Sequence, residues 1–472
     1  MAFSNILFLL FFLPALYLCY FCLPPRFRAG RNMVLLAFSL LFYACGGVDY
    51  LPILLASIAV NYLCGLLAAQ EHPKAIRRAG MWGAVAFGLG MLAWFKYAGF
   101  LVQNLNAIGA GIAMPQIVMP IGISFFTFQG LSYVIDVYRG QVGCQRNPLY
   151  VALYVALFSQ LVAGPIVRYA TVEREITGRQ ESLSDFSQGA VRFLFGLGKK
   201  MLLANAMGEI TDTIFAQSPD TMAASLAWLG AAAYTFQIYF DFSAYSDMAI
   251  GLGQMFGFHF LENFNYPYIS KSVTEFWRRW HISLSSWFRD YVYIPLGGSR
   301  CSRRRNILNL AVVWLLTGLW HGAAWTFVLW GVWFLLLLIG ERCLWGSGLD
   351  RLPNPLRHTY TILAVMFSWV LFRSADLGYA AAYFGAMFGI GGSATDGQTV
   401  YYLLEYWPEW IACLIAALPI KIWLQEKLAE KEHGPAALAR EWFPKLTALC
   451  LLVLSYLKLD SGSFNPFIYF QF

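Results

Sequence analysis

Charged residues are scarce in this sequence. Lysine, arginine, aspartate and glutamate make up 12% of the 472 residues, about half of the roughly 25% that soluble domains carry. With 59% hydrophobic residues, the chain is too apolar for a water-soluble globule and for intrinsic disorder. It also lacks a heptad or Gly-X-Y repeat. The composition therefore predicts a polytopic membrane protein.

Motifs for nucleotides, metals and disulfides are missing as well. Gly251 and Gly253 match the start of a dinucleotide fingerprint, but Phe256 stands where that motif needs glycine. The nine cysteines are an odd number and lie mostly in apolar runs, so no disulfide framework is expected. Cys19 and Cys22 have C-x-x-C spacing without a second ligand pair, which favours simple packing. We predict no metal site and no permanently bound cofactor.

The basic residues are spread between hydrophobic runs and are densest over residues 271–305. The formal net charge of +7 therefore indicates membrane topology, and nucleic acid is not an expected partner. Arg26, Arg28 and Arg31 follow the first apolar run, whereas a secretory signal has its basic residues in front. We expect that run to remain as an anchor, with the N-terminus outside the cytoplasm.

Long apolar runs are what the sequence has in abundance. Because a helical crossing takes about 20 residues, they have room for about eleven or twelve crossings plus re-entrant and interfacial helices. Residues 332–340 are continuously apolar, whereas the strands of a barrel alternate. We predict an all-α polytopic membrane protein with one domain over 1–472, a cytoplasmic interfacial helix at 421–445 and a C-terminal tail at 460–472. The candidate spans lie near residues 3–23, 33–47, 50–69, 79–102, 117–136, 149–165, 190–206, 221–240, 243–260, 307–320, 323–341, 359–372, 380–391, 399–420 and 446–459.

Polar residues inside these runs are the first functional candidates, because an ionisable group at membrane depth costs about 2.5 to 3.5 kcal/mol. Gln237, Asp241 and Tyr245 follow one another at intervals of four and share one face of a helix if that helix is unbroken. Asp241 and Asp247 have two interpretations. Each either acts as a structural acceptor, which ties helices together or caps the start of a helix, or contacts substrate.

Residues 274–285 combine aromatic and basic side chains, as expected at the cytoplasmic interface. His281 in this segment is either an interfacial histidine bonded to a carbonyl or part of a reactive site. Arg278, Arg279 and Arg289 lie around it in the sequence and are candidates for binding the phosphates of an anionic substrate.

A second histidine, His321, lies in the strongly apolar segment 314–325 between tryptophans. A neutral imidazole at membrane depth can accept a proton at pH 7, which is the requirement for a general base. The alternative is a packed, hydrogen-bonded histidine with a structural role. Gly318 and Gly322 are four residues apart and leave room for another helix or a slender substrate.

Several motifs resemble those of the membrane-bound O-acyltransferase family, in the bacterial branch of alginate O-acetyltransferase membrane subunits. The matching blocks run in order along nearly the whole chain. They include "MPIGISFFTFQGLSYVIDVYRG" from Met119, "QLVAGPIVRY" from Gln160, "QIYFDFSAYSDMAIGLGQMFGF" from Gln237, "NFNYPYISKSVTEFWRRWHISLSSWFRDYVYIPLGG" from Asn263, "TGLWHGAAWTFVLWG" from Thr317 and the tail "NPFIYFQF".

The resemblance implies a ring of transmembrane helices around a funnel, with His321 as the catalytic histidine and His281 as the second recurrent one. It implies an O-acetyltransferase of the bacterial inner membrane that takes acetyl from a cytoplasmic thioester, acetyl-CoA by expectation. The acetyl group then passes outward to a polysaccharide such as alginate, with periplasmic or membrane-anchored partner proteins. Tyr469 in the tail is an expected acyl relay; its alternative role is an aromatic anchor at the membrane surface.

Other functions stay open at this stage. Within the same chemistry, the acceptor can be peptidoglycan or cellulose, and the donor can be a carrier-protein thioester. A different class is a proton-coupled transporter or flippase that uses the intramembrane histidine and aspartate residues as a proton relay. Transport predicts internal repeats and several acidic residues along a path, and neither is evident in the sequence.

Overall fold

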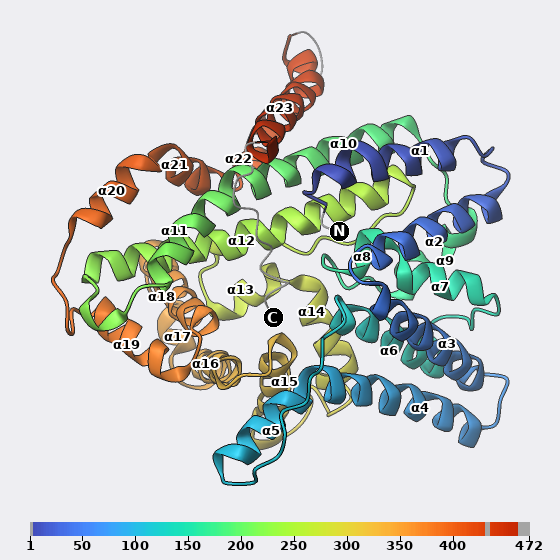
Figure 1. The fold of residues 1–472 in the computed structure, drawn as a ribbon, viewed down its shortest axis with the longest axis horizontal. Coiled ribbons are helices and arrows are strands. Elements are labelled where there is room, and N and C mark those ends of the chain that lie inside the picture. Colours follow the sequence, from blue (N-terminus) through green and yellow to red (C-terminus); the bar gives the residue numbers. More distant parts are fainter. Residues whose placement is uncertain (1–2, 430–434, 461–472) are drawn as a thin grey trace. The chain divides into compact units, whose positions relative to one another are not determined.

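The computed structural model of the chain describes residues 3–429 and 435–460. Every regular element of this part is a helix (Figure 1), which confirms the all-α prediction. Contacts within the chain divide it into two compact units: unit 1 is Met1–Phe193 with Asp247–Leu261, and unit 2 is Leu194–Ser246 with Glu262–Phe472. The expected single domain over 1–472 stays a prediction.

Unit 1 holds the first half of the helices. They are η1 (Phe8–Phe12), α1 (Leu13–Phe21), α2 (Arg28–Ala44), η2 (Val48–Tyr50), α3 (Leu51–Ala68), α4 (Lys74–Leu92), η3 (Ala93–Tyr97), α5 (Ala98–Ala107), α6 (Ile123–Arg139), α7 (Pro148–Ala156), α8 (Phe158–Leu161), α9 (Tyr169–Gly178) and the start of α10 (Leu183–Gly198). The end of α12 (Ala224–Met255) also belongs to this unit.

Unit 2 continues from the end of α10. Its helices are η4 (Lys199–Ala204), α11 (Asn205–Phe215), η5 (Pro219–Thr221), most of α12, η6 (Pro267–Ile269), α13 (Val273–Arg279), α14 (Ile282–Phe288), η7 (Arg289–Tyr293), α15 (Arg303–His321), α16 (Trp325–Gly340), η8 (Glu341–Trp345), α17 (Gly346–Leu349), α18 (Asn354–Arg373), α19 (Leu377–Met387), α20 (Gly397–Glu405), α21 (Trp407–Ala416), α22 (Ile420–Ala429) and α23 (Pro435–Asp460).

Two expected boundaries were wrong. The spans 221–240 and 243–260 are parts of one 32-residue helix, α12, because no proline or glycine interrupts residues 231–250. Conversely, the single span expected at 399–420 consists of α20 and α21, which meet at Tyr406. Pro408 stands at the start of α21, where a proline without an N–H is tolerated in a new helix but not inside an old one.

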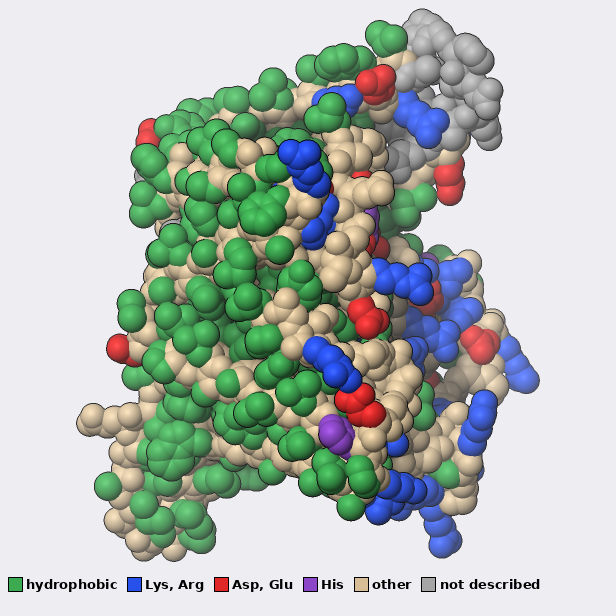
Figure 2. All heavy atoms as spheres, turned by 90° about the vertical axis from the view of Figure 1, so that its right-hand side faces the viewer, with side chains coloured by type: hydrophobic (Ala, Val, Ile, Leu, Met, Phe, Trp, Pro, Cys, Tyr) green, Lys and Arg blue, Asp and Glu red, His purple; other side chains and the backbone are tan. Residues whose placement is uncertain are grey.

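Lipid-facing character is visible on the surface and in the helix lengths. Hydrophobic side chains cover much of the face that Figure 2 shows, and residues such as Leu344, Phe388 and Leu18 are 74%, 69% and 69% exposed. In the described residues, four helical segments are long and apolar enough to cross a membrane: Val48–Ala68, Lys74–Ala107, Trp325–Leu349 and Arg440–Asp460. The expected total of eleven or twelve crossings and the interfacial location of 421–445 stay predictions.

A buried ion cluster organises part of unit 1. Arg28, Arg31 and Arg179 all pair with Glu181, which follows α9, and three of these four side chains are less than 10% exposed. Although burial of the carboxyl opposes the effect, hydrogen bonds from Arg28 and Tyr20 lower the pKa of Glu181 to about 2. The cluster therefore holds α1 and α2 against the α9–α10 connection.

In unit 2, the hairpin of α15 and α16 is packed at backbone contact. A Cβ added to Gly318 would collide with the carbonyl oxygen of Phe327, and one added to Gly331 would collide with that of Trp314. The sequence left two possibilities for the space beside Gly318 and Gly322: another helix or a slender substrate. In the structure, helix α16 occupies that space.

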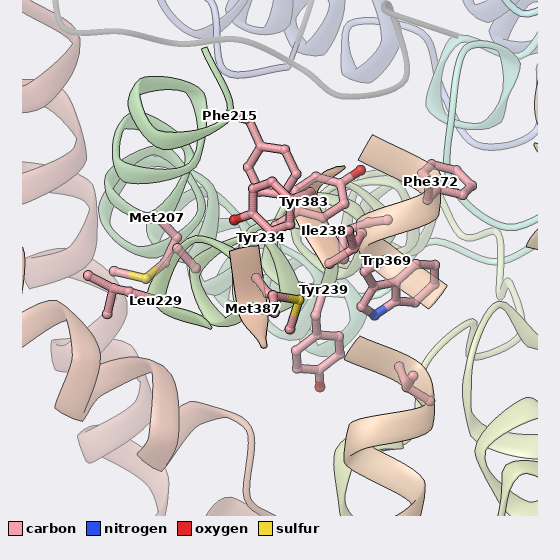
Figure 3. Packing of buried hydrophobic residues seen from close by; sticks show 14 of the residues in the cluster. Met207, Phe215, Leu229, Tyr234, Ile238, Tyr239, Trp369, Phe372, Tyr383 and Met387 are labelled. Carbon is pink, nitrogen blue, oxygen red and sulfur yellow. The ribbon is translucent and has the colours of Figure 1, made fainter. Parts of the chain in front are cut away.

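Aromatic and methionine side chains fill the core beside this hairpin. Figure 3 shows Trp369 and Phe372 of α18 and Tyr239 and Ile238 of α12, which belong to one buried cluster. In the same cluster, the ring of Tyr383 stacks on that of Phe215 with 4.4 Å between the centroids. Large rings bury much apolar area and lock one another by edge-to-face contacts. This packing gives the neighbouring histidines rigid surroundings.

The backbone contact predicts a strong effect of small substitutions. Gly318→Ala should separate α15 from α16 and lower stability by about 1 to 3 kcal/mol, since overpacking strains a close-packed core. The melting temperature of the purified protein in detergent measures this. Gly99→Ala is the matched control, because an added Cβ there meets nothing within 4 Å. Equal melting temperatures for the two variants would contradict the close contact.

Candidate active site

His321 is the last residue of α15 and is 9% exposed. Its ring lies edge-on to three aromatic rings, at centroid distances of 5.0 Å from Trp320, 4.8 Å from Trp330 and 5.1 Å from Phe372. Trp330 belongs to α16 and Phe372 to α18, so three helices enclose the imidazole. An apolar enclosure of this kind excludes water and restricts the ring to few orientations.

The second histidine, His281, lies between α13 and α14 and is fully buried. Its backbone is in the left-handed region, with φ 44° and ψ 54°, which costs a non-glycine residue of order 1–3 kcal/mol. Its ring contacts Phe242 of α12 at 4.6 Å, and its Nδ1 lies 3.2 Å from Asn263 Oδ1. The strained backbone at a buried titratable residue is typical of functional sites.

One indole joins the two histidines. The ring of Trp320 lies 5.8 Å from that of His281 and 5.0 Å from that of His321. The structure therefore brings both sequence-predicted histidines into one aromatic environment of unit 2, although they are far apart in the sequence.

Helix α13, which leads into His281, is fixed at its N-terminus by two acceptors. Ser272 Oγ accepts a hydrogen bond from the backbone N–H of Glu275 at 3.0 Å, as in a capping motif. Glu341, at the end of α16, accepts from the backbone N–H groups of Val273 at 2.6 Å and Thr274 at 2.9 Å. A carboxylate at a helix N-terminus also favours the helix dipole. The position of His281 thus depends on the α16 end of the hairpin.

The polar seam on α12 is continuous, because the helix is unbroken and Gln237, Asp241 and Tyr245 are all at most 5% exposed. Asp241 pairs with Lys200 of η4 at 2.6 Å, and both side chains are nearly inaccessible. This contact ties two helices together, in agreement with the structural interpretation of Asp241. Asp247 pairs with Arg192 at 2.9 Å in unit 1.

The three candidate arginines differ in availability. Arg279 pairs with Glu275 at 3.0 Å, and Arg289 pairs with Asp290 at 2.6 Å. Arg278 is exposed and forms no hydrogen bond or ion pair with residues 3–429 or 435–460. It is therefore the arginine of this group most able to bind an anion.

Two other predictions from the sequence, the acyl relay and the absence of a metal site, remain predictions. Tyr469 lies outside the described residues, so the acyl relay stays a prediction. In the part of the chain that the structure describes, no three His, Cys, Asp or Glu side chains are grouped so that they could hold a metal ion.

Comparisons with known proteins identify the family to which the chain belongs. Residues 145–373 match the profile of the MBOAT, membrane-bound O-acyltransferase family. The chain is 40% identical to "Probable alginate O-acetylase AlgI" of Azotobacter vinelandii and 39% identical to that of Pseudomonas aeruginosa, with 100% of each chain covered in both comparisons. The chain belongs to the membrane-bound O-acyltransferase family. It is a membrane acyltransferase.

A more distant relative of this acyltransferase is "Peptidoglycan O-acetyltransferase" of Helicobacter pylori, which is 30% identical over 100% of this chain and 97% of that protein. The relatives thus share their length with the chain but differ in the polymer that their names give. The difference leaves the acceptor of this acyltransferase to be argued separately.

Three contributors to the site were not identified from the sequence. Lys200 lies in the expected span 190–206. The two adjacent lysines in this apolar run, Lys199 and Lys200, could have identified it as a functional candidate. Asn263 lies in an irregular segment. Glu341 lies at the end of an apolar run, 68 residues from Val273 in the helix that it caps. Pairing across such distances cannot be read from residue spacing.

The buried ion pair between Lys200 of η4 and Asp241 of α12 predicts that the stability effects of substitutions at these two residues are not additive. Lys200→Met or Asp241→Leu alone should cost about 3–5 kcal/mol, because the remaining charge is buried without its partner. The double variant should recover most of that loss. Thermal unfolding of the four proteins measures the coupling.

The exposed pair Lys445–Glu441 at 2.9 Å is the control cycle, with an expected coupling of about 0–1 kcal/mol. Additive losses at Lys200 and Asp241 would show that the ion pair is not formed in the membrane.

Proposed function

We propose that this acyltransferase transfers acetyl from a cytoplasmic thioester, acetyl-CoA, and passes it across the bacterial inner membrane to a polysaccharide outside. The observation that carries the proposal is His321 at the end of α15 inside its aromatic enclosure. Family membership supplies the acyl-transfer chemistry, and the names of the relatives support a polymer acceptor.

The reaction requires little covalent help from the protein. The oxygen of a hydroxyl attacks the thioester carbonyl carbon, the C–S bond breaks, and an ester and a thiol result. His321 takes the hydroxyl proton and returns it to the leaving sulfur, so no net proton is released. The surrounding rings exclude water, which would otherwise hydrolyse the thioester.

Tyr469 fits this scheme as the first hydroxyl acceptor, since a phenol can carry acetyl as an ester to a partner protein. The partners that the proposal requires are periplasmic or membrane-anchored transferases that deliver acetyl to the polymer. An alginate-like exopolysaccharide is the favoured acceptor, because relatives named for alginate are about 40% identical. Peptidoglycan is the second candidate, supported by the 30% identical relative.

His321→Gln should reduce acetyl transfer by about 10²- to 10⁴-fold, the usual contribution of a general base. Transfer of labelled acetyl from acetyl-CoA in membranes measures it, with expression and melting temperature checked in parallel. His72→Gln, a half-buried histidine between α3 and α4, should keep normal transfer.

The same variants can be expressed in cells from which the gene is deleted, with ester-linked acetate measured on exported polysaccharide and on peptidoglycan. The polymer that regains acetate with wild type and His72→Gln, but not with His321→Gln, is the acceptor. Normal transfer by His321→Gln excludes it as the base, and substrate uptake without any transfer supports a transporter.

Arg278→Gln should raise the KM for acetyl-CoA about tenfold, the equivalent of one lost charge-assisted contact of roughly 1.4 kcal/mol. Arg289→Gln should have a smaller effect, because Asp290 already neutralises that arginine. KM values at low and high ionic strength measure both effects, and added salt should reduce the difference. Equal KM values would leave Arg278 as a topology residue.

A further inference from the structure

Asn263 is the centre of a hydrogen-bond cluster next to His281. Its Oδ1 lies 3.2 Å from the backbone nitrogen of Ser283, 2.9 Å from Ser283 Oγ and 3.2 Å from His281 Nδ1. Its Nδ2 donates to Ser246 Oγ at 3.1 Å. Asn263 is 1% exposed. Its backbone carbonyl oxygen accepts a further hydrogen bond from the backbone N–H of Ile282 at 3.0 Å.

The backbone of Ser283 fixes the orientation of this amide. A peptide N–H can only donate, so the atom that faces it must be the acceptor Oδ1. The amide cannot be turned over without placing its NH₂ against that N–H. Asn263 Oδ1 is therefore also the atom that faces the His281 ring.

The orientation of the amide in turn fixes the tautomer of His281. An acceptor at 3.2 Å from Nδ1 requires a proton on Nδ1, and a neutral imidazole then has its lone pair on Nε2. The ring is fully buried and contacts Asn263, Ser283, Phe242 and Trp320, none of which is charged. An unpaired imidazolium in these surroundings is unfavourable, so the ring is neutral.

His281 Nε2 has no hydrogen-bond partner among the described residues, although it is completely buried. A buried acceptor without a partner is costly, and here the strained left-handed backbone of His281 holds it in place. The two features together point to a group that arrives from outside the described chain.

We propose that Asn263 is a positioning residue that holds His281 as its Nδ1-protonated tautomer, so that Nε2 accepts a hydrogen bond from an O–H or N–H group of a bound substrate. This inference rests on the proposed acyl transfer for its substrates. The hydrogen bond to Nε2 can come from either of two substrates. A thioester of pantetheine has amide N–H groups, and the acceptor of the acetyl group has a hydroxyl.

The tautomer itself is testable without activity. The chain has only six histidines, so a ¹⁵N spectrum of protein labelled at histidine is sparse, and His281→Gln assigns the His281 signals. Wild type should show a protonated Nδ1 and an unprotonated Nε2 at pH 7. Asn263→Leu should lose this preference, and a protonated Nε2 in wild type would overturn the proposal. This result is independent of whether acetyl transfer is the correct function.

The pH profile gives the second test. Asn263→Asp keeps an acceptor beside Nδ1 but introduces a carboxylate, which favours the imidazolium. Nε2 is then protonated and cannot accept at neutral pH, and it regains its lone pair as pH rises. The acidic limb of the kcat profile should therefore move upward by about one pH unit or more. Asn309→Asp, at a buried asparagine of α15, is the matched control and should show no shift.

Binding of acetyl-CoA to Asn263→Leu separates the two sources of the donated hydrogen bond. At least tenfold weaker binding assigns it to the pantetheine amides. Unaltered binding with at least tenfold lower kcat assigns it to the hydroxyl acceptor. Unaltered binding together with unaltered kcat overturns the proposal, as does an Asn263→Asp profile that coincides with wild type.

Discussion

The backbone contact between α15 and α16 determines where His321 lies. Gly318 and Gly331 leave no room for side chains between the two helices, and the short turn after His321 starts α16 immediately. Trp330, one and a half turns into α16, is thereby placed against the imidazole. A close glycine contact between two helices thus sets the position of a reactive group that aromatic rings surround.

The hydrogen-bond partner of His281 is uncharged. A carboxylate beside Nδ1 would favour an imidazolium, whereas the neutral amide of Asn263 orients the ring and leaves it uncharged. Where unit 2 does bury a carboxylate, at Asp241, it supplies Lys200 as an opposite charge at 2.6 Å. The buried polar groups Asn263 and Asp241 are thus neutral and charge-paired, respectively, as a low-dielectric interior requires.

The sequence predicted the elements of this site better than their connections. The spacing of Gln237, Asp241 and Tyr245 predicted that they share one helix face if the helix is unbroken, and α12 is unbroken across them, because helical periodicity is a local property. The partner of Asp241 and the cap on α13 depend on segments brought together only by folding. Helix boundaries were least predictable: α12 runs through polar residues, and α20 ends at Glu405 inside the span that was expected at 399–420.

Aromatic rings contact both histidines: Trp320, Trp330 and Phe372 enclose His321, and Phe242 and Trp320 lie against His281. In addition, the amide oxygen of Asn263 lies 3.2 Å from His281 Nδ1 and fixes the tautomer of that ring. Ring packing restrains orientation while allowing the proton state to change, as a base that takes and returns a proton requires. A fixed tautomer, in contrast, suits a group that only accepts a hydrogen bond. Since aligning two reactants can contribute several kcal/mol more than proton transfer, the rigid residue is as important to this chemistry as the reactive one.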